Sequence, residues 1–137
     1  MKITIIGVEP PCPRCARIYD LVVSVVTELD LEAAVTKIPY DSADTKKFGR
    51  VGTAHDIAQW ADVSMDWSRI KDIVVDGWSR ELDEFLMPCA DKARENGWLM
   101  TPVLAVDEKV VCMGHVPDKE YIKKTIIEHM EKGGAEK

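Results

Sequence analysis

The sequence predicts an α/β domain in which helices cover a four-stranded mixed sheet. Three observations lead to this fold class: an apolar run at residues 3–8, a helical pattern directly after it, and a second strand pattern at residues 32–38. A strand, a helix and a strand in this order form a right-handed crossover with parallel strands. A strand pair and a helix near the carboxyl end complete the predicted sheet.

The first strand is expected to be central in the sheet. Its apolar residues, Ile3, Ile5, Ile6 and Val8, form a nearly continuous run, which is typical of a strand that is covered on both faces. In the helix that follows, apolar residues recur at helical spacing, at Ile18, Leu21, Val22, Val25, Val26 and Leu29. Many of these residues are β-branched and favour helix weakly, so we expect packing to stabilise this helix.

The middle of the chain is expected to be a helical insertion, at about residues 40–87, within a single domain that spans residues 1–137. Apolar spacing predicts three helices between the second and third strands, at residues 54–61, 66–75 and 79–96. Pro88 in the last of these either kinks the helix or begins a separate one.

The carboxyl-terminal part is expected to supply a hairpin and a final helix. Residues 102–106 and 109–113 have strand character, and Asp107-Glu108 is the turn between them. Asp118 is expected to cap a helix over residues 119–131, followed by a frayed polar tail from Gly133.

Composition narrows the classes of function. A net charge of −6 argues against a nucleic-acid partner, because such proteins normally present a basic face. No segment approaches the roughly 18–20 apolar residues of a membrane helix. Met1 leads directly into a strand, without a targeting segment before it. We therefore expect a cytoplasmic protein without a membrane partner, in a compartment that keeps thiols reduced.

The chemistry is expected at Cys12 and Cys15, between the first strand and the first helix. Two cysteines at this spacing fit on one helical turn, so their sulfurs can join and separate while the fold stays intact. Backbone N–H groups at the start of the helix would stabilise a Cys12 thiolate, and Arg14 adds positive charge. Pro11 and Pro13 stiffen the active-site loop around the first cysteine.

The same two cysteines could instead hold a soft metal ion, Cu(I) or zinc, in a binding or delivery module. Structural zinc normally uses a second cysteine pair, whereas Cys89 and Cys112 are single. The residues therefore favour redox chemistry, with no metal site, over metal binding. Cys112 is expected to be a buried thiol in a strand, and Cys89 is a candidate third thiol of the redox site.

These features together resemble the thioredoxin superfamily, in particular its small archaeal and bacterial redox-active disulfide proteins. The resemblance covers residues 1–39 and 88–131. It rests on C-P-x-C after the first strand, on Thr101-Pro102 before a hairpin, and on the G-x-V-P sequence that begins at Gly114. It implies a cis peptide bond at Pro102, which would lie against the two active-site sulfurs.

The resemblance further implies a thiol–disulfide oxidoreductase that uses no cofactor besides its Cys12–Cys15 disulfide. An exposed Cys12 would attack protein or small-molecule disulfides, and a buried Cys15 would resolve the mixed disulfide. The backbone of Thr101 would bind a substrate peptide as an added strand. A disulfide reductase would donate the electrons. The helical insertion departs from the family pattern, and we expect it to cover one side of the site and narrow the range of substrates.

Overall fold

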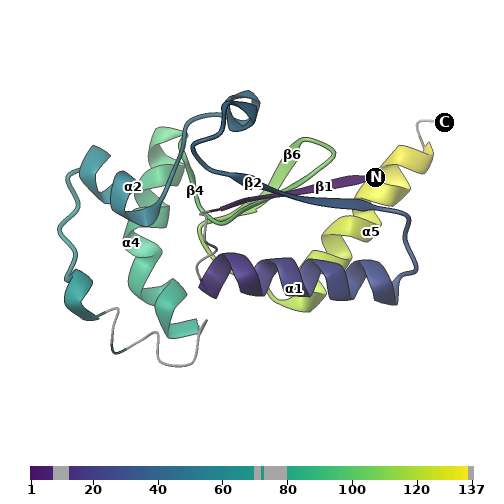
Figure 1. Ribbon diagram of the computed structural model, residues 1–137, viewed down its shortest axis with the longest axis horizontal. Coiled ribbons are helices and arrows are strands. Elements are labelled where there is room, and N and C mark those ends of the chain that lie inside the picture. The colour runs from purple at the N-terminus through teal and green to yellow at the C-terminus, as the bar shows by residue number, and fades with distance from the viewer. Residues whose placement is uncertain (8–12, 70–71, 73–79, 136–137) are drawn as a thin grey trace.

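The computed structural model describes residues 1–7, 13–69, 72 and 80–135, and its central feature is a four-stranded mixed sheet (Figure 1). The strands follow the order β2-β1-β5-β6, and they are β1 (Lys2–Gly7), β2 (Ala34–Pro39), β5 (Val103–Val106) and β6 (Lys109–Met113). β1 is parallel to β2 and antiparallel to β5, and β5 is antiparallel to β6. The prediction of an α/β fold with a four-stranded mixed sheet is therefore confirmed.

β1 lies inside the sheet, between β2 and β5, as its sequence predicts. All of its residues except Lys2 are buried. Ile3 and Ile5 belong to the main hydrophobic core, together with residues of two helices, α1 (Pro13–Glu28) and α5 (Lys119–Ala135). Ile18 and Val22 of α1 and Ile122 and Ile126 of α5 are fully buried there. Apolar packing thus supports the β-branched α1, as expected.

Ion pairs also join the end of α1 to the start of α5. Glu28, in the last turn of α1, forms ion pairs of 3.1 Å with Lys119 and 3.2 Å with Lys123 of α5. Both lysines lower the pKa of the Glu28 carboxyl through hydrogen bonds and charge. The two helices therefore contact each other as well as the sheet.

A second hydrophobic cluster lies beyond the end of the sheet at which α1 begins (Figure 1). It is built from α2 (Ala54–Trp60), α4 (Arg80–Asn96) and Met100 of β4 (Leu99–Met100). The short strand β4 pairs in parallel with β3 (Val51–Gly52). A capping box begins α2, because Thr53 Oγ1 accepts the Asp56 N–H and the Asp56 carboxylate accepts the Thr53 N–H.

The helical pattern of the insertion differs in part from the prediction. The helix at 79–96 is observed as α4 and runs through Pro88, which is exposed, so the Glu84 carbonyl that Pro88 cannot bond is on the solvent side. In the segment predicted as helix 66–75, Trp67–Arg69 form the 3-10 turn η2 and residue 72 is helical. Residues 70–71 and 73–75 of this prediction lie outside the described residues. A further 3-10 helix, η1 (Ala43–Phe48), has no counterpart in the prediction.

Element ends also differ from the prediction. The strand expected at residues 102–106 begins at Val103, since proline lacks the N–H that a ladder requires. The last helix continues to Ala135, past its predicted end at Glu131 and through Gly133 and Gly134, because a glycine weakens a helix without breaking it. Within the described ranges, none of the helices combines the length and the apolar character needed to cross a bilayer.

Candidate functional site

The candidate site lies where β1 ends and α1 begins. Cys15, in the first turn of α1, is only 2 % exposed, which agrees with the buried second cysteine expected from the sequence. Its sulfur packs directly on the backbone of Gly7, since a Cβ at Gly7 would lie 2.7 Å from Cys15 Sγ. Any side chain at residue 7 would therefore displace this thiol or the strand.

The Thr101-Pro102 bond is cis, as predicted, and it lies at the same end of β1. Ile6 and Val103 form the last pair of this antiparallel ladder, so Gly7 and Pro102 are the next residues of the two segments. The carbonyl of Pro102 accepts the Gly114 N–H at 3.0 Å, and Thr101 is 3 % exposed. Cys15, Gly7 and the cis bond are therefore brought together from segments that are far apart in the sequence.

The other residues of the predicted active-site loop are described only in part. Pro13 is the first residue of α1, as expected for a proline in a first helical turn, and Arg14 follows it in that turn. Pro11 and Cys12 lie outside the described residues. The expected exposure of Cys12 and its contact with Pro102 remain predictions.

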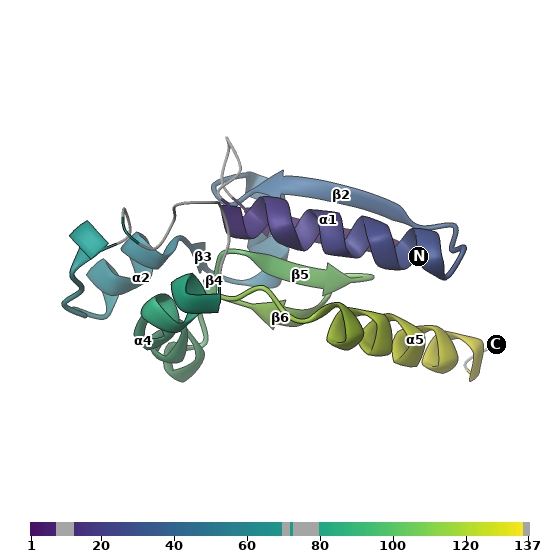
Figure 2. The same ribbon diagram turned by 90° about the horizontal axis from the view of Figure 1, so that it is seen from below.

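The backbone N–H of Thr101, where a substrate peptide is expected to bind, forms a hydrogen bond within the chain. This N–H donates to the Gly52 carbonyl at 3.0 Å, and the Leu99 N–H donates to the Arg50 carbonyl at 2.8 Å. These bonds join β3 to β4 at the end of the sheet where β5 begins (Figure 2). The Thr101 N–H therefore already has an acceptor within the chain. Sequence reasoning missed this pairing because a two-residue strand has no periodic pattern.

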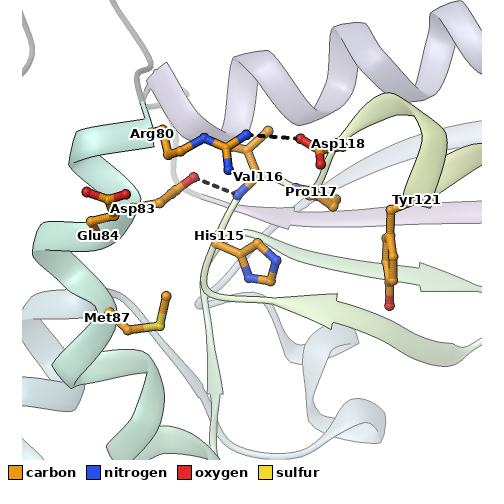
Figure 3. Close-up of a pocket in the computed structure, with 9 residues that line it drawn as sticks. All are labelled: Arg80, Asp83, Glu84, Met87, His115, Val116, Pro117, Asp118 and Tyr121. Atoms are coloured by element: carbon orange, nitrogen blue, oxygen red, sulfur yellow. Dashed lines mark hydrogen bonds and ion pairs between the residues drawn. The ribbon is translucent and has the colours of Figure 1, made fainter.

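A cavity of about 350 Å³ opens between the start of α4 and the loop into α5 (Figure 3). Asp83, on α4, is buried, and its carboxylate accepts the Val116 N–H at 3.1 Å. Arg80 and Asp118, both exposed, form an ion pair of 3.3 Å across the cavity rim. Asp83 therefore holds the loop that contains the G-x-V-P sequence against α4.

The sequence analysis did not identify Asp83 as a positioning residue. It lies three residues before Leu86 and seven before Ala90, which are buried on the same helix. A carboxylate on the edge of an apolar stripe is the signal that could have found it, because buried carboxylates normally have specific partners.

The two remaining cysteines are buried away from solvent. Cys112 is 8 % exposed, as expected for a strand thiol, and burial raises its pKa to about 12, with the negative charge of Asp83 adding to the effect. Its Sγ lies 3.7 Å from Nε2 of His115. Cys112 is therefore a protonated thiol at neutral pH. Cys89 is fully buried in the second cluster, so in this conformation a dissolved disulfide cannot reach the candidate third thiol.

In the part of the chain that the structure describes, no group of three or more His, Cys, Asp or Glu side chains could hold a metal ion.

Comparisons with known proteins add no family assignment. No family model, no curated protein and no solved structure matches this chain.

Proposed function

We propose that this protein is a thiol–disulfide oxidoreductase of the thioredoxin superfamily, in which Cys12 and Cys15 alternate between dithiol and disulfide. One observation carries the proposal: the buried Cys15 thiol packs on Gly7 at the end of the central strand, where the register also places the cis Thr101-Pro102 bond. The strand order β2-β1-β5-β6, with α1 and α5 packed against one core, fits the topology that this superfamily implies.

The proposed reaction is a two-electron exchange. The Cys12 thiolate attacks a substrate disulfide, forms a mixed disulfide and releases one substrate thiol. Cys15 then attacks the Cys12 sulfur, which closes the intramolecular disulfide and releases the second thiol. The protein is oxidised by two electrons while the substrate disulfide is reduced, and a disulfide reductase or another dithiol restores the reduced form. No other cofactor enters the cycle.

The burial of Cys15 suits the resolving role. The Cys15 thiol is 2 % exposed, so an external disulfide has little access to it. A mixed disulfide on Cys12, three positions earlier, would bring the Cys12 sulfur close to the Cys15 thiol. The first attack is therefore assigned to Cys12. A reducing cytoplasm would supply the electrons that the cycle requires.

The test is the reaction of the reduced protein with dithionitrobenzoate, which releases coloured thionitrobenzoate. The native chain should release two equivalents rapidly and end as an intramolecular disulfide. Cys15→Ser should release one equivalent and keep a mixed disulfide that is visible by mass, and Cys12→Ser should lose the rapid phase. Cys112→Ser is the matched control, because its thiol is buried and protonated.

Rapid and complete exchange in both Cys12→Ser and Cys15→Ser would refute the proposal. Stoichiometric Cu(I) or zinc in protein purified without oxygen would instead indicate the metal-binding use of the same two cysteines.

A further inference from the structure

We propose that β3 occupies the hydrogen-bonding edge of β4 beside the redox site. As a result, the protein reduces small-molecule disulfides and does not bind extended peptides by strand addition. This inference rests on the proposed oxidoreductase function. It concerns the class of substrate, and the residues that carry it, from Arg50 to Gly52 and from Leu99 to Thr101, all lie within the described part of the chain.

The backbone hydrogen-bonding groups at this edge of β4 are already in use. In a strand, the N–H and the carbonyl of one residue point to the same edge. The N–H groups of Leu99 and Thr101 already donate to Arg50 and Gly52, so this edge of β4 faces β3. A peptide that paired with the N–H of Thr101 would need the same donor, and two acceptors cannot share it at full strength.

Side-chain packing also holds β3 in place. Gly52 is buried, and a Cβ on it would lie 2.7 Å from the Trp60 ring and 3.0 Å from Cβ of Asp56. The Arg50 guanidinium lies 3.7 Å from the centre of the same ring. Trp60 in turn meets Trp98 edge to face, with ring centres 5.4 Å apart. A peptide that replaced β3 beside β4 would have to break both backbone hydrogen bonds and separate Arg50 from the Trp60 ring.

A small disulfide makes no such demand. Its reaction needs one of its sulfurs to approach Cys12 and needs no backbone partner. The atoms balance without any further reactant: one disulfide and the protein dithiol yield two small thiols and the protein disulfide, and dithiothreitol can restore the dithiol. The pairing of β4 with β3 thus hinders peptides that bind by strand addition and leaves small disulfides unaffected.

The experiment compares disulfides that carry different lengths of peptide backbone around the reacting sulfur. The native protein, reduced and freed of reductant, is mixed with three symmetrical disulfides: 2-hydroxyethyl disulfide, the disulfide of N-acetylcysteine amide, and that of a peptide with serines and alanines on both sides of its cysteine. The second-order rate constant of each reaction is measured from the loss of the disulfide. A fourth substrate, the same peptide with N-methylated amides next to its cysteine, is the matched control, because it cannot pair as a strand.

We expect the peptide to react no faster than the N-acetylcysteine amide disulfide, and N-methylation to leave its rate constant unchanged. A peptide that reacts about tenfold faster, and loses this advantage on N-methylation, would overturn the inference while leaving the oxidoreductase function intact. Failure of all four disulfides to react would instead refute the proposed function itself.

Amide hydrogen exchange gives a second readout that does not depend on activity. The Thr101 amide should exchange slowly, and a large excess of the reduced, thiol-blocked peptide should not change its rate. Rapid exchange that the peptide suppresses would contradict the closed edge.

Discussion

Gly7 shows how a single residue sets the position of the candidate redox thiol. It has no side chain, and the Cys15 sulfur uses the space that a Cβ would fill. Sequence alone gives no sign of this requirement, because residue 7 lies at the end of an ordinary apolar strand. The close approach becomes visible only when the strand and the helix are placed together.

Gly7→Ala should therefore disturb both stability and thiol chemistry. Its Cβ would lie 2.7 Å from Cys15 Sγ, so the strand or the first turn of α1 must move. We expect a loss of about 1–3 kcal/mol in the free energy of unfolding, as for other overpacked cores. Urea denaturation of the reduced protein measures this loss. Unchanged stability, with unchanged reaction toward dithionitrobenzoate, would show that the thiol does not pack on Gly7.

The ionisation of Asp107 is expected to make the stability of the fold depend on pH in the acid range. Its carboxylate accepts the Lys2 N–H at 2.7 Å and contacts His129 at 2.8 Å, and together these partners lower its pKa below the ordinary value of 3.8. A carboxyl with a lowered pKa stabilises the fold above its unfolded pKa, and this contribution disappears as the pH falls through the folded pKa.

Asp107→Asn should thus be less stable than the native chain near neutral pH, and the difference should shrink below about pH 4. Urea unfolding at several pH values measures this difference. Asp20→Asn, which removes an exposed carboxylate from α1, is the control and should leave the profile nearly unchanged. A constant difference between Asp107→Asn and the native chain down to pH 2 would contradict the assignment.

At the scale of elements, α4 depends on a polar contact as well as on its apolar stripe. Asp83 accepts the Val116 N–H while buried, so it joins the first turns of α4 to the loop before α5. Burial raises the pKa of Cys112, and the negative charge of Asp83 adds to this effect.

Asp83→Ala should lower the free energy of unfolding by about 1–3 kcal/mol, because it leaves the buried Val116 N–H without its acceptor. Asp83→Asn keeps an acceptor oxygen and should lose clearly less, which separates the hydrogen bond from general packing. Thermal or urea denaturation of both variants measures the difference. Equal losses in the two variants would argue against the bond to Val116 as the cause.

The elements also show which parts of the fold were predictable. Long segments with a clear period, such as α1, α4 and α5, were predicted, because the helical spacing of their apolar residues is visible in the local sequence. β3 and β4 were not predicted, because two residues carry no period and their pairing depends on distant contacts. The helix expected near Trp67 begins as a 3-10 turn, in which the Ser68 hydroxyl donates to the Asp66 carboxylate.

At the scale of the whole molecule, two hydrophobic clusters meet near the candidate site. One is formed by the sheet with α1 and α5, and the other by α2, α4 and Met100. The chain passes from the second cluster into the sheet at the cis Thr101-Pro102 bond. The sequence predicted this bond and the burial of Cys15, but the role of the insertion as an internal strand partner required the three-dimensional arrangement.

The central claim is that Cys12 and Cys15 form a reversible disulfide, and peptide mapping in redox buffers tests it most directly. Arg14 lies between the two cysteines, so trypsin separates them and only a disulfide can keep the two peptides joined. Across buffers of reduced and oxidised dithiothreitol, we predict one two-electron transition that links these peptides, is lost in Cys12→Ser, and leaves Cys89 and Cys112 as thiols. A pair that stays reduced in every buffer, or that oxidises only with Cys89 or Cys112, would contradict the account.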